Sequence, residues 1–311
     1  MSTAANIATG LRWLGMPAFL AVATIGAPLV AVAIPFVMLP TLGLLYTRRR
    51  LPKSKQADLD ALTYIYLGSG TIGIAAVILG QLALVWAITK PLFGNQADTY
   101  FEEFARTTIK DLTPEQIALR ARLASSWRHW IFLITMTYCT AGFVEELFKY
   151  GPIEILRRQH RLVSQKAIPK QVYVQHAVAA ALGFCTTENI AFTRIAVQAG
   201  ESGWKLALTI FERVMIGSPG HCLTAALLAI NVARLGDYQT TPRNLWRILG
   251  GPIFWHGTVD FMLIAVSSLE GNVGWIHPER PWVVVSGLAL VECIQLALLW
   301  QVQRAWRSLG E

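Results

Sequence analysis

Long apolar runs, separated by short polar stretches, dominate this chain. A helix of about 20 apolar residues can cross the hydrocarbon core of a bilayer. The pattern therefore predicts an all-α, polytopic membrane helix bundle of about seven transmembrane helices. The first run holds Pro28, Pro35 and Pro40 and is longer than one span needs, so we expect it to be kinked or to form two pieces. The seven runs lie near residues 17–46, 63–89, 130–156, 172–199, 214–235, 247–269 and 282–303.

Composition agrees with this pattern, because 54% of the residues are hydrophobic and 15% are charged, whereas soluble domains carry about 25% charged residues. The first run is too long for the apolar core of a cleaved signal peptide and no tidy cleavage site follows it. The 4 cysteines all fall inside apolar runs, so we expect them to pack as small apolar residues rather than form disulfides or a CxxC metal site.

Positive charge gives an orientation, because short loops rich in lysine and arginine stay in the cytosol. Two loops have this character, at residues 48–55 and 157–170. With seven spans, the N-terminus then faces out and the C-terminus is cytosolic. The net charge of +8 is explained by this topology and by contact with anionic lipids. Nucleic-acid binding is not expected, since no basic stripe alternates with exposed aromatic residues.

Three regions differ in character. Residues 1–128 form an N-terminal pair of membrane spans plus an extramembrane connector, and the two spans carry no ionisable residue in their apolar interiors. We therefore expect these two spans to serve packing or to face lipid. In the connector, Thr113-Pro114-Glu115-Gln116 predicts the start of a short helix near 114–126. Residues 129–270 hold the polar spans, and residues 271–311 form a C-terminal span.

Polar residues gather in four successive spans of the middle region. The third span contains two adjacent carboxylates and an ammonium, each of which costs about 2.5–3.5 kcal/mol in the bilayer centre unless it faces the bundle interior and has a partner. All of these residues fall within a turn or two of mid-membrane, so they can meet. They are Glu145, Glu146 and Lys149 in the third span, Glu188 and Asn189 in the fourth, His221 in the fifth, and His256 and Asp260 in the sixth.

Spacing assigns some of these side chains to common helix faces. His256 and Asp260 lie four residues apart, which is a common way to present two metal ligands from one helix. The same spacing relates Glu145 to Lys149, so we expect that pair to interact, while Glu146 points about 100° away around the helix. The other histidines are expected to be solvated at span ends or in loops; they are His129, His160, His176 and His277.

Carboxylates and imidazoles that converge in a dry cavity suit a divalent metal, above all Zn²⁺ with nitrogen and oxygen ligands. Such an ion lowers the pKa of a bound water, and a neighbouring glutamate can take the proton as the water attacks a carbonyl. A metal-free site is also possible, in which a buried carboxylate activates water and a histidine stabilises the oxyanion.

The motifs, in the same order along the chain, resemble the PrsW family of intramembrane proteases, relatives of the CAAX prenyl endopeptidases and bacteriocin-immunity proteins. Phe192 stands where that family often has tyrosine. The matching motifs are Glu145-Glu146-x-x-Lys149, Glu188-Asn189, Arg213 followed by Pro219-x-His221, and His256-x-x-x-Asp260. This resemblance implies a four-helix catalytic core, a glutamate that activates water, and histidine and acidic residues at or near a metal.

By position, the resemblance implies that Glu145 is the base, supported by Glu146 and Lys149. Glu188 and Asn189 lie alongside. His221, His256 and Asp260 are implied as metal ligands or oxyanion stabilisers.

Three functions follow as hypotheses. The first is an intramembrane metallopeptidase that cleaves a membrane-anchored protein. The second is a membrane enzyme in which a buried carboxylic acid protonates or cyclises a lipophilic small molecule of the terpenoid or prenyl class. The third is a non-catalytic scaffold or transporter whose charges line a path for an ion.

Overall fold

The computed structural model describes residues 16–25, 27–163, 168–201, 203–235 and 242–309. These residues form helices and no strand. Six helical segments among them are long and apolar enough to cross a membrane, which confirms the all-α polytopic bundle: Val30–Arg50, Lys53–Ala105, Trp127–His160, Trp204–Leu235, Asn244–Ser268 and Pro281–Arg307.

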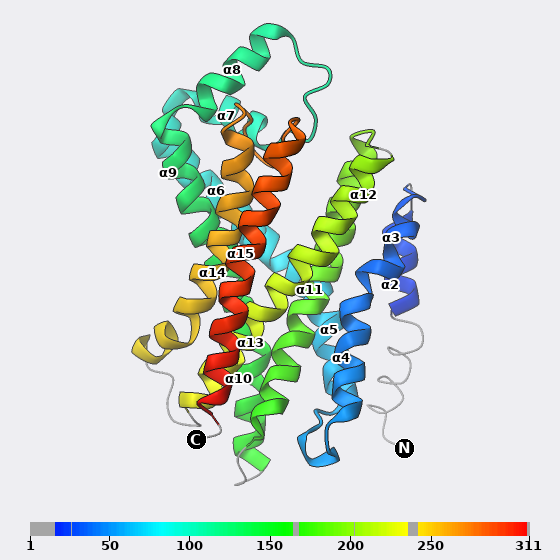
Figure 1. The fold of residues 1–311 in the computed structure, drawn as a ribbon. Helices are drawn as coiled ribbons and strands as arrows, with labels where there is room; N and C mark the ends of the chain where they lie inside the picture. The colour runs from blue at the N-terminus through cyan, green and yellow to red at the C-terminus, as the bar shows by residue number, and fades with distance from the viewer. Residues whose placement is uncertain (1–15, 26, 164–167, 202, 236–241, 310–311) are drawn as a thin grey trace.

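The seventh expected span corresponds to α11 (Lys170–Gln198), a helix of 29 residues that runs through the middle of the bundle (Figure 1). It is not among the six, because its histidine, threonines, Glu188, Asn189 and Arg194 lower its hydropathy. Most of its middle section, from Ala177 to Thr186, is buried by its neighbours rather than exposed to lipid. A polar helix is tolerated there because protein surrounds it.

The N-terminal region confirms the expected breaks at proline. It begins with α2 (Met16–Thr24), α3 (Val30–Val37) and α4 (Leu39–Arg50), with Pro35 inside α3 and Pro40 in the first turn of α4. After the short helix η2 (Lys53–Lys55), the chain returns through α5 (Leu59–Gly68), the π-helical segment η3 (Ser69–Gly73) and α6 (Ile74–Phe93).

A small extramembrane layer caps one end of the bundle. It comprises η4 (Gly94–Gln96), α7 (Ala97–Ala105) and α8 (Pro114–Ala124). The predicted start of α8 is confirmed, since Thr113 and Gln116 form a reciprocal capping box. Buried Arg120 fixes this layer to the bundle by donating to Glu103 Oε2 at 2.5 Å and to the carbonyl of Val273 at 2.6 Å.

The remaining helices form the core of the bundle, and two further π-helical segments interrupt them. In chain order they are α9 (Trp127–Thr135), η5 (Met136–Glu145, π), α10 (Glu146–Val163), α11, α12 (Trp204–Phe211), η6 (Glu212–Gly217, π), α13 (Ser218–Leu235), α14 (Pro242–Ser268) and α15 (Pro281–Arg307). An apolar cluster from α10, α11, α13 and α14 closes the bundle opposite the cap.

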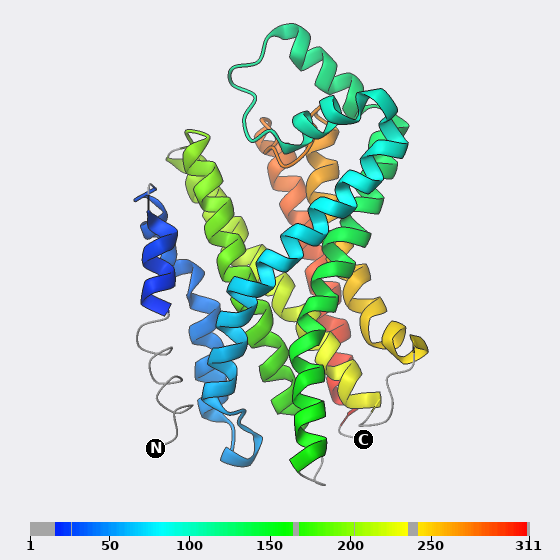
Figure 2. The ribbon, with the colours of Figure 1, turned by 180° about the vertical axis from the view of Figure 1, so that it is seen from behind.

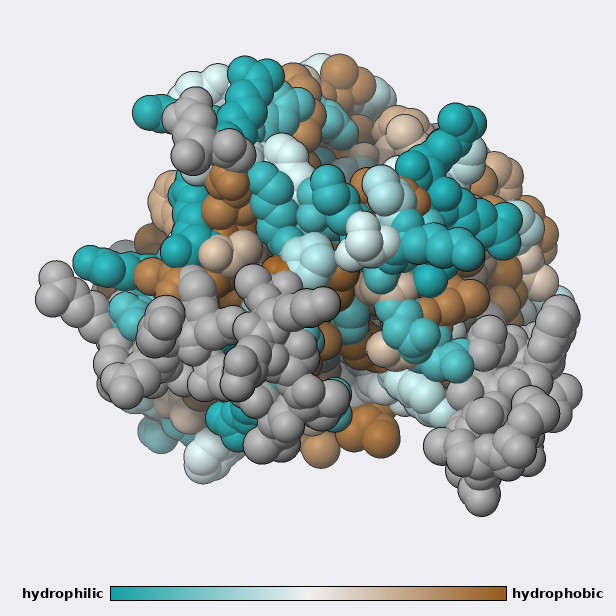
Figure 3. Space-filling model, turned by 90° about the horizontal axis from the view of Figure 1, so that it is seen from below, coloured by the Kyte–Doolittle hydropathy of each residue, from teal (hydrophilic) through white to brown (hydrophobic). Residues whose placement is uncertain are grey.

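The positively charged loops lie at the same end of the bundle. The link between α4 and α5, the end of α10 and the end of α15 are all at the lower end in Figure 1. Figure 3 looks onto this end and shows hydrophilic residues gathered over its centre. The described parts of these loops therefore share one side of the bundle, and the assignment of that side to the cytosol stays a prediction. Residues 1–15 and 164–167, which bear on the expected outward N-terminus and on the second loop, lie outside the described residues.

Two of the other histidines are buried, contrary to the expectation that they are solvated. His129 is 0% exposed, and its ring hydrogen-bonds the hydroxyls of Tyr100 at 2.7 Å and Ser268 at 2.9 Å. His176 is 3% exposed and bonds the carbonyl of Val172. The cap and the ends of neighbouring helices cover positions that a span boundary alone would leave in water.

Glycines set the spacing between η5 and α14. A Cβ on Gly142 would lie 2.9 Å from the carbonyl oxygen of Ile253, and a Cβ on Gly257 would lie 2.6 Å from Cδ1 of Tyr138. Both distances are too short for a carbon atom, so the two backbones can approach this closely only because these positions lack side chains. The carboxylate of Glu145 and the imidazole of His256 are carried by these two segments.

We expect Gly142→Ala to destabilise the protein by about 1–3 kcal/mol, because the added methyl forces the two backbones apart. Thermal unfolding in detergent measures the effect. Gly151→Ala is the matched control, since a Cβ there meets nothing within 4 Å. Equal stability of the two variants would contradict this account of the close packing.

Ion pairs join the α14–α15 link to the α11–α12 link and to η6. His277 Nε2 lies 2.7 Å from Glu212 Oε2, and His277 Nδ1 lies 3.8 Å from Glu201 Oε1. The nearby carboxylates of Glu201 and Glu212 raise the pKa of His277 from 6.5 to about 10. A raised pKa in the folded state means that the charged histidine stabilises the fold at low pH, and that this contribution disappears as the pH rises from 6.5 through about 10.

His277→Gln is therefore expected to lower stability at pH 6 and to have little effect at pH 10.5. We expect about 1 kcal/mol or less at pH 6, because the partly exposed pair is screened by water. Unfolding temperatures of both proteins at the two pH values test this, with His160→Gln in α10 as the control. A stability difference that does not change with pH would show that the charge of His277 contributes nothing.

Candidate metal centre

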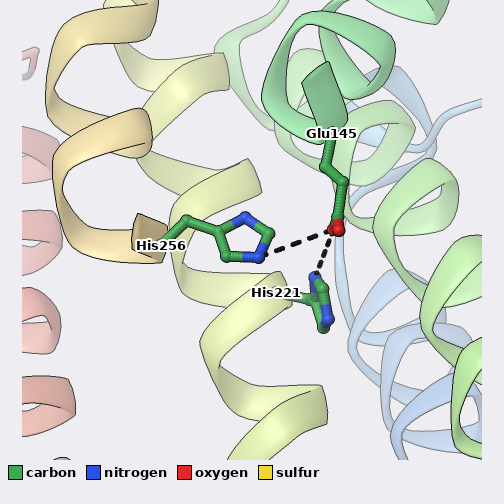
Figure 4. Close-up of side chains that lie close together, drawn as sticks. All are labelled: Glu145, His221 and His256. Carbon is green, nitrogen blue, oxygen red and sulfur yellow. Dashed lines mark ion pairs between the residues drawn. The ribbon is translucent and has the colours of Figure 1, made fainter. Parts of the chain in front are cut away.

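Glu145, His221 and His256 come from three segments and point toward one another (Figure 4). Glu145 is the last residue of the π-helical η5, and His221 follows the π-helical η6 by four residues. A π turn shifts the phase of every side chain after it, and such turns are frequent at functional sites. The local departures from α-helix thus help to aim both side chains inward.

The three side chains could hold one ion. Each offers an atom, and these atoms all lie within 4.8 Å of one another. Glu145 Oε2 is 3.5 Å from His256 Nε2 and 4.0 Å from His221 Nδ1. All three residues are buried, and Glu145 Oε2 has no hydrogen-bond partner. A buried, unpaired carboxylate oxygen is costly, so a missing cation, proton or water belongs beside it.

Each histidine donates a hydrogen bond to a carboxylate through the ring nitrogen that points away from Glu145. His256 donates from Nδ1 to Glu146 Oε1 at 2.7 Å, and His221 donates from Nε2 to Glu188 Oε2 at 3.0 Å. Metal-binding histidines commonly make this kind of bond through the ring nitrogen that does not touch the metal. The bonds leave His256 Nε2 and His221 Nδ1 facing Glu145.

The predicted pairing of Lys149 with Glu145 is wrong. Lys149 Nζ donates to Glu146 Oε1 at 2.7 Å, and the hydroxyl of Thr224 donates to the same oxygen at 3.0 Å. Glu146 and Lys149 both lie in α10, and the three-residue spacing between them is as suited to side-chain contact as the four-residue spacing from Glu145. Glu146 and Lys149 are 0% and 1% exposed, which makes them a buried ion pair.

Glu188 and Asn189 belong to a second polar group on the other side of His221. Arg213 NH2 donates to Glu188 Oε2 at 2.5 Å, and Arg213 Nε donates to Asn189 Oδ1 at 3.0 Å. The guanidinium also lies 4.3 Å from the centre of the Phe192 ring. Arg213 therefore neutralises Glu188 and keeps it turned toward the histidine.

Asp260 lies next to the three-residue group but is not part of it. Its Oδ2 is 3.6 Å from His256 Nε2, and the side chain is 18% exposed. The spacing prediction that His256 and Asp260 share a helix face is consistent with this contact. The remaining exposure of Asp260 is to the cavity described next, which it lines.

Gln81 reaches the group from α6, a span that we expected only to pack or face lipid. Its amide donates to Glu145 Oε1 at 3.0 Å. Buried charge does not mark this residue in the sequence, because the amide of Gln81 is neutral. The signal in the sequence is that Gln81 is the only amide or charged side chain between Ile74 and Ile88.

A cavity of about 530 Å³ extends from the three-residue group to the extramembrane cap. Its walls are mostly apolar. Five large apolar residues that line it are exposed, namely Ile78 and Leu82 of α6, Phe101 of α7, Ile195 of α11 and Trp275 of the α14–α15 link. The cavity therefore has an apolar mouth at the edge of the bundle, between α6 and α11.

The mouth exists because α11 packs against η3, which precedes α6 in the second span, whereas α6 itself diverges from α11 (Figure 2). Where α11 meets η3, a Cβ on Gly70 would lie 2.6 Å from the carbonyl oxygen of Gly183, and Thr187 donates to the carbonyl of Gly70 at 2.6 Å. Small residues thus allow backbone contact at the base of a V, and the cavity occupies the space above it.

The residues fit a divalent cation. Two imidazoles and one carboxylate form a donor set known from catalytic zinc sites, which keep a further position open. The unpaired Glu145 Oε2 and the carboxylates behind both histidines support this fit. One contact competes with it, since Lys149 Nζ donates to His221 Nδ1 at 2.9 Å. His221 Nδ1 can bind a cation only when Lys149 gives up this contact and keeps its hydrogen bond to Glu146.

We expect Lys149→Met to destabilise the protein by about 3–5 kcal/mol, because it leaves the buried Glu146 carboxylate without its cation. The double variant Glu146→Gln/Lys149→Met is expected to be more stable than Lys149→Met. The neutral amide can still accept from Thr224 and His256. Thermal unfolding in detergent compares the variants, and losses that simply add would contradict the pairing.

Comparison with known protein families gives one match. A model described as PrsW family intramembrane metalloprotease matches residues 74–290. This range begins at α6 and includes Gln81 and every site residue described above. No curated protein and no solved structure gave a match. The match confirms the resemblance drawn from the motifs and extends it to the second span.

Proposed function

The chain belongs to the PrsW family of intramembrane metalloproteases, and from this premise we propose that it cleaves a membrane-anchored protein close to the bilayer. The observation that carries the proposal is the convergence of Glu145, His221 and His256 on one buried point. A cation held there, most suitably Zn²⁺, supplies a Lewis acid and lowers the pKa of water.

The four carboxylates of the site have different surroundings, which suggests different tasks. Glu146 is fully buried by Lys149, Thr224 and His256, so it supports a histidine and cannot reach a substrate. Glu188 has the same supporting task for His221 and is neutralised by Arg213. We therefore assign neither of these two carboxylates as the acceptor of a proton from water.

Glu145 and Asp260 flank His256 Nε2 at 3.5 Å and 3.6 Å, and they remain for ion binding and proton transfer. We assign Glu145 to the ion-binding group, because its free oxygen also faces His221. Asp260 is then the proton acceptor, because its side chain is 18% exposed on the cavity wall, whereas that of Glu145, which also lines the cavity, is 4% exposed. This assignment differs from the one implied by the motif resemblance, in which Glu145 is the base and Asp260 a ligand.

In the proposed reaction, Asp260 takes a proton from a water molecule while the oxygen of that water bonds to the carbonyl carbon of the peptide. The bond from that carbon to nitrogen then breaks, and Asp260 returns the proton to the departing nitrogen. The apolar walls of the cavity limit the entry of other water molecules. One peptide bond and one water are consumed, and a carboxyl and an amine are formed.

The mouth between α6 and α11 supports entry of the substrate from within the membrane. Its exposed residues are apolar, and the cap layer covers the outer end of the cavity. An apolar membrane segment of a protein can contact these residues without leaving lipid. A membrane-anchored protein therefore suits the approach to this site better than a soluble one.

Glu145→Gln is expected to lose bound metal, and Asp260→Asn is expected to keep it. Both variants are expected to lose cleavage, by about 10²- to 10⁴-fold for Asp260→Asn, which is the usual contribution of a general base. Elemental analysis of purified protein measures the metal. Cleavage is measured by comparing new protein N-termini in membranes of cells that express wild type or variant.

The outcomes distinguish the assignments. If Glu145→Gln keeps stoichiometric metal but is inactive, Glu145 is the base, as the motifs imply. If the purified wild-type protein holds no metal and chelation leaves its cleavage unchanged, the metallopeptidase proposal is wrong. Ser125→Ala, in the extramembrane connector, is the control and is expected to change neither the metal content nor the cleavage.

A further inference from the structure

We propose that Gln81 is a positioning residue for the metal centre: its side-chain amide holds one oxygen of Glu145 so that the other faces the two histidines. The inference rests on the proposed function only in treating Glu145 as an ion-binding residue. It assigns a task to the second membrane span, which carries none of the charged motifs.

The geometry separates the two oxygens of the Glu145 carboxylate. Oε1 accepts from Gln81 Nε2 at 3.0 Å, whereas Oε2 is buried without a hydrogen bond and faces His256 and His221. Among the described residues, Gln81 is the only one that donates a hydrogen bond to the side chain of Glu145. A carboxylate held at one oxygen cannot rotate freely about its last bond, so the direction of Oε2 depends on Gln81.

Chemistry favours an amide at this position. A glutamine can donate a hydrogen bond and remain neutral, so it restrains the carboxylate without adding a charge to the site. An ammonium or guanidinium at 3 Å would form an ion pair with Glu145 and weaken its attraction for a cation. An apolar side chain would leave Oε1 without a partner and free to turn.

The placement of α6 makes the contact possible. The Gly70–Gly183 contact fixes the lower end of this part of the chain against α11, and Gly73 packs against the ring of Phe148 in α10. Gly80, next to Gln81, would place a Cβ only 3.7 Å from Val144, beside Glu145. These contacts bring α6 within reach of η5 at the position of Gln81, on the wall of the cavity.

The test uses Gln81→Met, which keeps the length of the side chain and removes the donor. Residues that orient a metal ligand typically contribute 10- to 100-fold to metal affinity. We expect the Kd of the purified protein for Co²⁺ to rise by at least about 10-fold, and the visible absorption of bound Co²⁺ to change because the ligand geometry changes. Measurement of Co²⁺ binding alone requires no substrate.

The matched control is Gln301→Met. Gln301 is also a half-buried glutamine in a membrane helix with one side-chain partner, since it accepts from Trp255 Nε1 at 2.5 Å. This variant is expected to keep the Co²⁺ affinity and absorption of wild type. Thermal unfolding of both variants separates a loss of fold from a loss of metal geometry.

A double-mutant cycle with Glu145→Gln completes the test. Glu145→Gln leaves the two histidines to bind Co²⁺ weakly, and this weaker Kd is measured at raised Co²⁺ concentration; if Gln81 acts through Glu145, Gln81→Met does not change it further. An equal effect in both backgrounds would overturn the proposal, as would wild-type affinity and absorption in Gln81→Met. If wild type binds Co²⁺ and follows the cycle but cleaves no membrane protein, the peptidase proposal fails while the task of Gln81 stands.

Discussion

The buried ion pair between Glu146 and Lys149 is the interaction on which the centre of this bundle depends. Both side chains are withdrawn from solvent, and the 2.7 Å contact between them compensates for the loss of water. The same carboxylate oxygen accepts from Thr224 and from His256. One residue pair of the third span therefore connects α13 and α14 and orients an imidazole. The ionised Glu146 can exist at this depth only because its neighbours supply donors.

Packing of small residues converts this local network into a site. Close contact at Gly142 and Gly257 brings η5 against α14, and the contact of Gly70 with Gly183 brings the second span against α11. Because α6 and α11 then diverge, the same glycines that hold the helices together also leave a cavity with an apolar mouth. Close packing is found at the base of the V and around the ion pair, whereas the cavity lies above them.

The sequence allowed the bundle, its proline breaks and the capped helix at Pro114 to be predicted, since each depends on local chemistry. The convergence of Glu145, His221 and His256 was also predictable, because charged residues at mid-membrane have to find partners in the protein interior. The partners themselves were not predictable. Three-residue and four-residue spacings both place two side chains on one face of an α-helix, so spacing alone could not decide whether Lys149 contacts Glu145 or Glu146.

The roles of neutral polar residues could not be predicted from the sequence either. Gln81 has no charge to mark it, and His129 lies at a span end that the cap layer happens to bury. In both cases the surroundings that decide the role come from parts of the chain distant in sequence. A site of this kind is consequently built in two layers. Charged residues at mid-membrane form the inner layer, because their burial is costly unless they have partners in the protein interior. The neutral donors that aim them form the outer layer, and their positions follow from how closely the helices can approach.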